Sequence, residues 1–357
     1  MSLKKRFGFG VLLIIVVALA YLLLAPVPIT PGAWTPPAAP ALTGQYAQNT
    51  RLASVQKFSL GDGHKPEDVA IDSEGKIYAG FEDGRIMVLQ PDGSQPRVFA
   101  ETHGRPLGLI FDREGNLIVA DAIKGLLSVN KAGEVKLLAD EADGEKFGCL
   151  NDLDVGADGT IYFTEASNKF PMSQFANDIM EHQPNGRLLA LEPTSRRPRT
   201  LLRDVYFANG VAVSPDQTFV LVVETGMYRI RRVWLKEPKM GQNDIFIDNL
   251  PGFPDGVSSN GRDRFWVALV TPRQALFDRM LPYPSLRKVV ARLPKFFQPA
   301  PKRYSFVLGL DRQGRVVENL QNGSPDCYAQ IANVVEHNGA LYFGSIGEDT
   351  IARFPLQ

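Results

Sequence analysis

Four oxygen-bearing side chains recur at one place in a repeated sequence pattern. Each copy has a polar position, a short alternating segment, a tight turn and a second apolar segment, as in Asn151–Glu165 (NDLDVGADGTIYFTE). Counting eight residues back from the turn glycine, or its equivalent, gives the first position of the six copies: Glu67, Leu107, Asn151, Asn209, Asp255 and Ile331. Two carboxylates and two amide carbonyls form an all-oxygen donor set. Such a set suits Ca²⁺ better than the softer metals, and other divalent cations would fit the same donors.

A plainer explanation of the same residues stays open. Glu, Asn and Asp are common wherever a strand begins at solvent, so chance alone could place them at four of six positions. The positions predict a metal site only if the six copies converge in space.

The repeated unit itself predicts that convergence. Its apolar segments are short and rich in β-branched and aromatic residues, and a tight turn joins them, which is typical of β-hairpins. Six copies of such a unit predict an all-β fold, a six-bladed β-propeller. The first strand of each blade lines the central channel, so the equivalent tips meet near the axis. We therefore expect Glu67, Asn151, Asn209 and Asp255 to be metal ligands. Leu107 and Ile331 would then form an apolar wall for the acyl or aryl part of a substrate.

Composition narrows the class of protein. The chain has 357 residues, and after its N-terminus six blades use nearly all of them, so one closed domain over 46–357 is preferred. Lys plus Arg and Asp plus Glu number 39 each, which argues against a nucleic-acid partner held by bulk positive charge. The two cysteines, Cys149 and Cys327, form either a single pair or two buried free thiols.

The N-terminus predicts a membrane anchor over residues 1–25. Lys4-Lys5-Arg6 precedes an uninterrupted apolar run from Phe7 to Ala25, long enough to span a bilayer as a helix. The positive cluster places the N-terminus in the cytoplasm and the propeller on the non-cytoplasmic side, periplasmic or extracellular/lumenal. A cleaved signal peptide is the alternative, and it leads to the same compartment. Residues 26–45 are rich in proline, and we expect an extended linker that keeps the propeller clear of the bilayer.

Two insertions interrupt the blades, at about 166–187 and 272–302. The first carries several apolar residues and is either a lid over the channel mouth or a surface loop that buries its own side chains. The second is helical in its spacing, and its segment 273–297 is amphipathic, with aromatic residues on one side and basic residues on the other. That segment either lies on an anionic membrane surface or packs its apolar face onto its own domain.

Several phrases in the chain resemble one known family. PEDVAID, FANGVAVSPDQTFVLVVET, PGFPDGVSSNGRDRFWVAL and VVEHNGALYFGS occur in the order found in strictosidine-synthase-like propellers, in particular the adipocyte plasma membrane-associated proteins. The resemblance covers about residues 60–355 and the N-terminal anchor. The wider group includes paraoxonases and gluconolactonases, which are similar in their calcium-bearing channel. The resemblance implies metal-binding roles for Glu67, Asn151, Asn209 and Asp255.

Two departures from the family bear on the chemistry. Strictosidine synthases carry a Glu in the last blade, where this chain reads Gln330-Ile331-Ala332-Asn333, so condensation of the strictosidine type is disfavoured. Paraoxonases carry a His dyad near the channel mouth, where this chain has Asp121. Asp255 and Asp121 are therefore the candidate catalytic bases.

Together these features predict a membrane-tethered, calcium-dependent hydrolase of small-molecule lactones or aryl esters, in which water attacks a metal-polarised carbonyl. The alternative is a non-catalytic propeller, with a structural calcium ion and a face that binds a partner.

Overall fold

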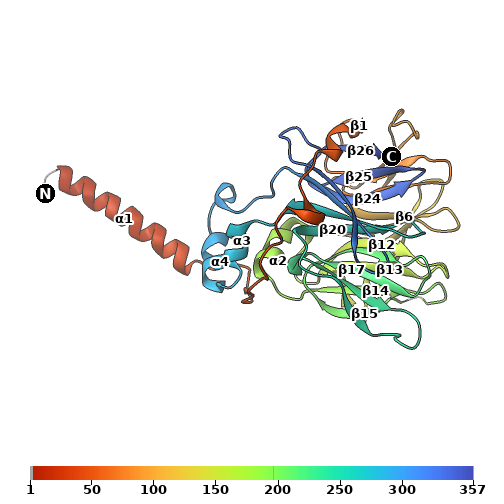
Figure 1. The fold of residues 1–357 in the computed structure, drawn as a ribbon. Helices are drawn as coiled ribbons and strands as arrows, with labels where there is room; N and C mark the ends of the chain where they lie inside the picture. The colour runs from red at the N-terminus through yellow and green to blue at the C-terminus, as the bar shows by residue number, and fades with distance from the viewer. Residues whose placement is uncertain (1–2, 196, 357) are drawn as a thin grey trace.

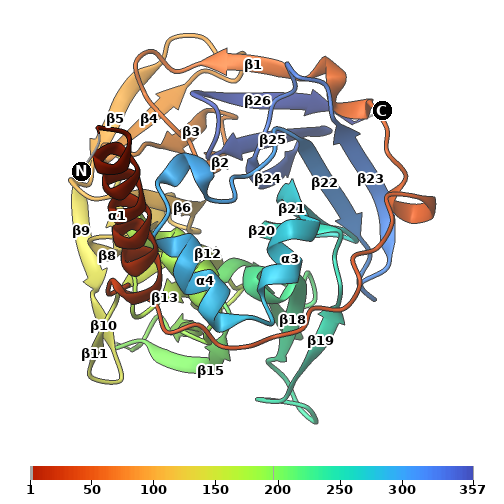
Figure 2. The ribbon, with the colours of Figure 1, turned by 90° about the vertical axis from the view of Figure 1, so that its left-hand side faces the viewer.

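Six four-stranded antiparallel sheets form a ring around a central channel (Figure 2). The computed structural model describes residues 3–195 and 197–356. The prediction of an all-β, six-bladed propeller is confirmed.

The strands follow one another in chain order, from the innermost strand of each blade to the outermost. Blade 1 contains β2 (Val69–Ile71), β3 (Ile77–Gly80), β4 (Arg85–Leu89) and β5 (Arg97–Glu101). Blade 2 contains β6 (Pro106–Phe111), β7 (Leu117–Asp121), β8 (Gly125–Val129) and β9 (Val135–Ala139). Blade 3 contains β12 (Cys149–Val155), β13 (Ile161–Ser167), β14 (Gly186–Leu191) and β15 (Arg199–Val205), and the hairpin of β10 (Glu141–Ala142) and β11 (Glu145–Lys146) precedes it.

The second half of the ring repeats this order. Blade 4 contains β16 (Ala208–Val213), β17 (Phe219–Glu224), β18 (Arg229–Trp234) and β19 (Asn243–Ile247). Blade 5 contains β20 (Gly252–Ser259), β21 (Phe265–Pro272), β22 (Ser305–Leu310) and β23 (Val316–Asn322). Blade 6 contains β24 (Ile331–His337), β25 (Ala340–Ser345), β26 (Thr350–Pro355) and β1 (Gln56–Ser59).

Local polar contacts stabilise the turn between the first two strands of a blade. In blade 1, Asp72 accepts hydrogen bonds from the backbone N–H groups of Glu74 and Lys76, both at 2.9 Å. Asp112 makes the same contacts with Glu114 and Asn116 in blade 2. An aspartate that bonds its own following backbone favours a turn over a continued strand, which is why the pattern breaks at these positions.

The N-terminal strand closes the ring. β1 pairs antiparallel with β26, so the chain's first strand is the outermost strand of its last blade. Phe58 of β1 is 5% exposed and packs in a cluster with Tyr342 and Ile351 of blade 6 and Leu89 of blade 1. Closure therefore buries apolar surface shared by the first and last blades.

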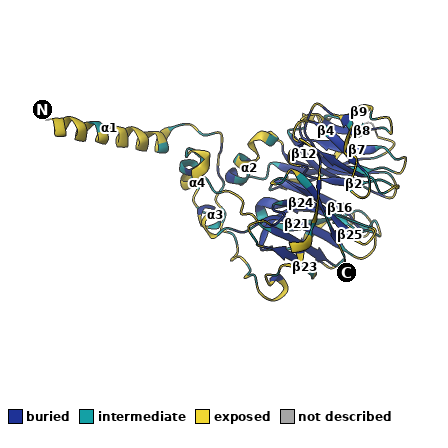
Figure 3. Ribbon diagram, turned by 90° about the horizontal axis from the view of Figure 1, so that it is seen from above, coloured by how far each residue is buried: buried dark blue, intermediate teal, exposed yellow. Residues whose placement is uncertain are grey.

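The two insertions cover one end of the channel. The first forms a short 3-10 turn and α2 (Phe175–Glu181), and the second forms α3 (Ala275–Met280), α4 (Pro284–Ala291) and a 3-10 turn, Lys295–Phe297. The apolar helix α1 (Leu3–Leu24) leaves from the same end (Figure 1), and none of its described residues is buried (Figure 3). α1 is long and apolar enough to cross a membrane.

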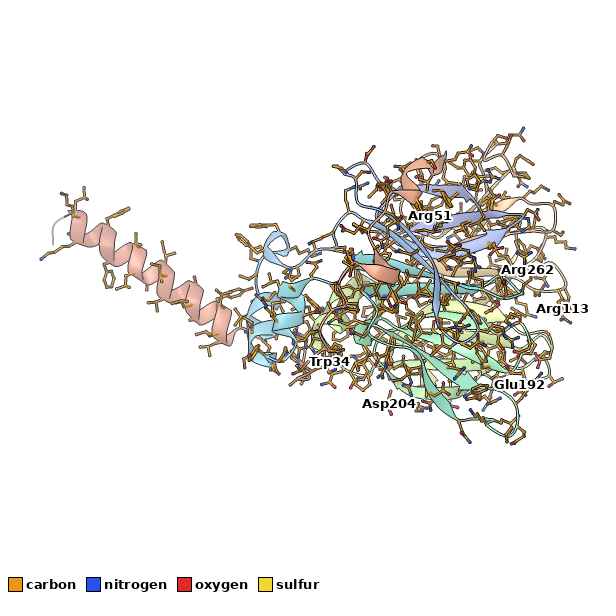
Figure 4. All side chains as sticks on the ribbon, in the orientation of Figure 1. Trp34, Arg51, Arg113, Glu192, Asp204 and Arg262 are labelled. Atoms are coloured by element: carbon orange, nitrogen blue, oxygen red, sulfur yellow. The ribbon has the colours of Figure 1, made fainter. Side chains whose placement is uncertain are left out.

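The inner-strand turns lie at the opposite end. Arg113 and Arg262, in the turns that follow the inner strands of blades 2 and 5, are on the side away from α1 (Figure 4). The beginnings of the inner strands therefore lie on the α1 side, beneath the insertions.

The proline-rich segment is not a free spacer, which corrects the expectation for residues 26–45. Ile29 is 2% exposed, and Trp34 stacks on His182 of the first insertion with ring centroids 4.6 Å apart. The carbonyl of Pro37 accepts a hydrogen bond from Arg273 at 2.8 Å. Because apolar and hydrogen-bonding contacts hold the segment against the insertions, it fixes where α1 emerges instead of distancing the propeller from it.

Ring closure gives a test of stability. We expect Phe58→Ala to lower the free energy of unfolding by about 3–5 kcal/mol, since a buried aromatic ring is replaced by a cavity between the first and last blades. The matched control is Val317→Ala on β23, whose side chain is 47% exposed. It should change stability by no more than about 0.5 kcal/mol. Urea unfolding followed by circular dichroism measures both. Equal small effects would show that closure by β1 does not stabilise the ring.

Candidate metal centre

The beginnings of the inner strands converge on one small cavity. Its volume is about 10 Å³, enough for a single water-sized particle and too small for an acyl group. The lining residues are Glu67, Asp68, Leu107, Gly108, Asn151, Asp152, Asn209, Asp255, Gly256, Ala332 and Asn333. The structure thus brings together Glu67, Asn151, Asn209 and Asp255, all of them 5–6% exposed, with Leu107 beside them.

Ile331 does not line this cavity, which corrects its place in the predicted apolar wall. In blades 1, 2, 3 and 5 five residues separate the last matched pair of the first two strands, as between Ile71 and Ile77. In blade 6 the pairing continues one pair further, to His337 and Ala340, and only four residues separate the preceding pair, Glu336 and Leu341. Counting back from the turn therefore errs by one residue there. A one-residue slip turns a side chain to the opposite face of a strand.

The blade 6 tip is accordingly Ala332. The side chain of Ile331 is fully buried in a cluster with Trp266 and Phe343, away from the channel. The sixth position remains apolar, but it is small.

Sequence reasoning missed three further polar residues of the cavity, Asp68, Asp152 and Asn333. Each directly follows a tip, and in a regular strand it would face the opposite side. Irregular pairing at the inner-strand tips, such as the shift between Leu150 and Leu153, instead lets both residues face the channel. The pairs of consecutive polar residues, Glu67-Asp68 and Asn151-Asp152, were the available signal.

Asp68 and Asp152, which directly follow the tips of blades 1 and 3, join neighbouring blades. Asp68 accepts a hydrogen bond from the backbone N–H of Leu109 in blade 2 at 2.7 Å and another from the side-chain amide of Asn333 in blade 6 at 2.6 Å. Asp152 accepts one from the backbone N–H of Val211 in blade 4 at 2.9 Å. Their oxygens are therefore engaged in blade-to-blade contacts.

The cavity concentrates negative charge away from water. Burial raises the pKa of Glu67, an effect that the Arg105 guanidinium 3.4 Å away partly offsets. Burial also raises the pKa of Asp255 well above its usual range, and the nearby charge of Glu67 raises it further. Burial raises the pKa of Asp68 to about 7. These shifts mean that the ionised carboxylates lack compensation from the protein alone.

A divalent cation fits this charge balance. Four carboxylates line the cavity, and none of its lining residues is cationic. Among the described residues, no three His, Cys, Asp or Glu side chains gather as a ready-made metal cluster, and the donor set here mixes carboxylates with amides. Glu67 and Asp255 would supply charge, and Asn151 and Asn209 would supply neutral oxygen, the hard donors that Ca²⁺ prefers.

Hydrogen bonds to neighbouring residues hold the side chain of Asn209 in place. Its amide nitrogen donates to the hydroxyl of Thr225 at 3.3 Å, and that hydroxyl donates to the carbonyl of Pro254 at 2.7 Å. Asn209 also hydrogen-bonds the carboxyl of Asp255, which lowers the pKa of that group against the larger effect of burial. Blades 4 and 5 are thus joined at the cavity.

Asp121 lies outside the cavity. One of its oxygens accepts hydrogen bonds from the backbone N–H groups of Arg105, Ile123 and Lys124, each at 2.9 Å. Glu165 accepts in the same way from Gly148 in blade 3, and Glu224 does so from Tyr206 in blade 4. Because the contact recurs at the end of the second strand in three consecutive blades, Asp121 has a structural explanation.

An apolar cluster lies between the cavity and the insertions. Leu107, which lines the cavity, packs with Phe207 and with Met172 and Ile179 of the first insertion. Cys149 belongs to the same cluster, and both it and Cys327 are free and buried. The first insertion therefore covers the channel mouth, as the lid interpretation expects.

Comparisons with known proteins agree with this architecture. The family model for strictosidine synthase matches residues 151–238, and the model for the N-terminal part of strictosidine synthase-like proteins matches residues 44–89. Protein STRICTOSIDINE SYNTHASE-LIKE 6 of Arabidopsis thaliana is 35% identical over 312 residues, covering 85% of this chain and 82% of that protein. The adipocyte plasma membrane-associated protein of Rattus norvegicus is 32% identical over 361 residues, covering 95% of this chain and 96% of that protein.

Solved structures show the same fold at lower identity. A gluconolactonase from Xanthomonas campestris superposes with a TM-score of 0.62 at 17% identity, covering 86% of this chain and 91% of its own. Regucalcin from Agrobacterium tumefaciens, described as a calcium-binding protein, superposes with a TM-score of 0.60 at 15% identity, covering 85% and 94%.

The charge of the cavity predicts how calcium affects stability. Wild-type protein should gain about 2.7 kcal/mol at a calcium concentration one hundred times the Kd. Asp255→Asn should lose most of that gain, because one of two charged donors is neutralised. After chelation the variant should be at least as stable as wild type, since the repulsion with Glu67 is removed.

Thermal unfolding with calcium and with chelator measures both effects. Glu114→Gln, an exposed turn substitution in blade 2, is the control and should keep the full gain. A calcium response unchanged by Asp255→Asn would place the ion elsewhere.

Proposed function

The chain belongs to the strictosidine synthase-like family, and we propose that it is a membrane-tethered, calcium-dependent hydrolase of lactones or aryl esters. The observation that carries the proposal is the convergence of Glu67, Asn151, Asn209 and Asp255 on an ion-sized cavity. Support comes from the fold, which is shared with a gluconolactonase and with a calcium-binding regucalcin.

The residues of the site have distinct proposed roles. A bound calcium ion would polarise the substrate carbonyl and stabilise the negative charge that develops on its oxygen. Asn151 and Asn209 hold the neutral side of the site, and Glu67 holds the charged side. Asp255 takes the proton from the attacking water, because Asp68 and Asp152 accept backbone N–H groups of neighbouring blades and Glu67 is paired with Arg105.

The proposed base is Asp255 alone. Asp121, the second candidate from the sequence, is fully buried outside the cavity, and one of its two oxygens accepts three backbone N–H groups. Leu107 and Ala332 form the apolar wall. No carboxylate stands at the blade 6 tip, so a condensation that requires an acid there is not proposed.

The acyl part of a substrate needs more room than the cavity has. A volume of about 10 Å³ holds the ion or a water molecule only. The substrate must therefore displace Met172 and Ile179 of the first insertion, which pack against Leu107 and Phe207. Loop movement of this kind commonly precedes chemistry in enzymes with covered sites.

The small volume of the cavity also favours a second candidate function. If the cluster does not open, the ion would only join the blades, and the protein would be a binding scaffold. Turnover discriminates the two functions.

We expect hydrolysis of phenyl acetate or a medium-ring lactone by the calcium-loaded protein. Asn209→Ala should lower kcat/KM by more than about 10- to 100-fold, the loss that even indirect contacts to a metal cause. Chelation should abolish activity while the far-ultraviolet circular dichroism persists. Asp121→Asn is the matched control, because it should lower the unfolding temperature and leave kcat of the folded enzyme unchanged. If the folded, calcium-loaded protein turns over none of a broad panel of esters and lactones, the hydrolase function is wrong and the binding scaffold replaces it.

The tether has its own test. We propose that α1 crosses the membrane once, uncleaved, with the propeller on the non-cytoplasmic side, because Lys4, Lys5 and Arg6 lie at its N-terminal end, before the apolar run. In sealed membrane vesicles whose cytoplasmic face is inside, added protease should degrade the propeller. Mass spectrometry of the membrane-bound protein should recover residues 7–25. Protection of the propeller from protease would contradict the proposed topology. Absence of residues 7–25 from the membrane-bound protein would contradict an uncleaved anchor.

A further inference from the structure

Exposed aromatic side chains gather at the covered end of the channel. Among the described residues outside α1, four aromatic side chains are exposed, and all four lie on the two insertions: Phe175, Tyr283, Phe296 and Phe297. Phe296 and Phe297 are 79% and 65% exposed. Leu276 of α3 and Leu286 of α4 are exposed on the same segments. A soluble surface rarely concentrates apolar groups in this way without an occupant.

The same segment carries cations that no carboxylate neutralises. Residues 272–302 contain one acid, Asp278, and it is engaged by Arg273 and by the hydroxyl of Tyr228. Four basic side chains form neither an ion pair nor a side-chain hydrogen bond within the described residues: Arg279, Lys288, Lys295 and Lys302. The surface is therefore both apolar and cationic, the combination that binds an anionic lipid leaflet.

Arg292 joins this surface to the anchor. Its guanidinium donates to the carbonyl of Ala25 at 2.6 Å and to that of Leu22 at 2.8 Å, at the C-terminal end of α1. Those carbonyls have no partner further along the helix, so the contact both caps α1 and fixes its end against the second insertion. α1 and the helices α3 and α4 of the second insertion thus lie on the same side of the propeller (Figures 1 and 2).

Buried Arg287 makes the rest of the face rigid. It donates to the backbone carbonyls of Met180 at 2.9 Å and Leu281 at 3.0 Å, and to that of Gly32. The first insertion, the second insertion and the proline-rich segment are therefore held by one side chain.

An apolar path connects this face to the metal cavity. Ile179 packs against two clusters, one that contains Leu107 of the cavity and one that contains Phe277 and Met280 of α3. Phe253 at the start of blade 5 belongs to the second cluster. An acyl chain that enters between the insertions would meet apolar side chains along the whole route.

We propose that the surface formed by residues 275–297 rests on an anionic lipid leaflet, so that the channel mouth faces the bilayer. We further propose that the substrate is an acyl amphiphile that enters from the lipid, and this second step rests on the proposed hydrolase function. A lipid surface is a better fit than a protein partner, because the aromatic residues, the unpaired cations and a membrane-length helix share one side.

Spin labels at two sites test the docking. The full-length protein is placed in bilayer discs of phosphatidylcholine and phosphatidylglycerol, with a nitroxide on Phe297→Cys or on Met240→Cys. Cys149 and Cys327 are only 1% and 2% exposed, so labelling stays at the introduced cysteine. Met240 is the matched control because it is 59% exposed and lies in the loop between the third and fourth strands of blade 4, at the opposite end.

We expect the label at position 297 to be more accessible to oxygen than to a nickel chelate, and the label at 240 to show the reverse. Lys295→Glu, or discs of phosphatidylcholine alone, should shift the label at 297 toward water, whereas Lys131→Glu on a blade 2 turn should not. Because α1 keeps the protein in the disc in every case, the experiment measures the depth of the spin label in the bilayer and not whether the protein binds. A label at 297 that reads as aqueous in anionic discs would overturn the docking and leave the face to a protein partner.

Activity in the same discs tests the route of the substrate. The variant Phe296→Ser/Phe297→Ser should hydrolyse a long-chain lactone dissolved in the discs about tenfold more slowly than wild type, a loss of about 1.4 kcal/mol. It should hydrolyse water-soluble phenyl acetate at the wild-type rate. Equal effects on the two substrates, or none on either, would overturn entry from lipid. If wild type hydrolyses neither substrate, the hydrolase function and entry from lipid both fail, while the spin labels still decide the docking.

Discussion

Mutual repulsion among buried carboxylates is the constraint on which this propeller depends. Glu67, Asp68, Asp152 and Asp255 lie at one level of the channel, where burial raises the pKa of each. Isolated buried charges of one sign are strongly unfavourable unless hydrogen bonds or a cation compensate them. The fold supplies part of the compensation through backbone N–H groups of adjacent blades. The carboxylates are therefore both a source of strain and the contacts that join blades, and a cation would relieve the strain.

The space around the axis limits how many side chains can stand at that level. The residue after each tip is Asp68, Asp152 or Asn333 in three blades and glycine in the other three. A Cβ on Gly108 would lie 2.7 Å from the Cα of Asp152, and one on Gly256 would lie 2.5 Å from the side-chain oxygen of Asn333. Glycine in one blade thus makes room for the polar side chain of the next. This close approach keeps the cavity as small as an ion.

The sequence was sufficient for the fold and for most of the cavity, because both depend on local periodicity. The repeat predicts six blades, and its register places Glu67, Leu107, Asn151, Asn209 and Asp255 at the cavity. It fails where local geometry departs from the repeat. The shorter turn of blade 6 exchanges Ile331 for Ala332, and irregular pairing brings Asp152 and Asn333 to the channel. Neither departure has a signature in periodicity alone.

The position of the proline-rich segment could not be predicted for a different reason. Its composition is that of a linker, and no pattern within residues 26–45 indicates a partner. Its partners are residues far along the chain. The guanidinium of Arg287 donates to the carbonyl of Gly32, and the carbonyl of Leu281 accepts from the backbone N–H of Trp34. The ring of His182 stacks on the indole of Trp34. Because these contacts join α1 to both insertions, the segment determines from which end of the channel α1 emerges. The orientation of the cavity toward α1 is thus a tertiary property, to which one buried arginine and one stacked indole contribute.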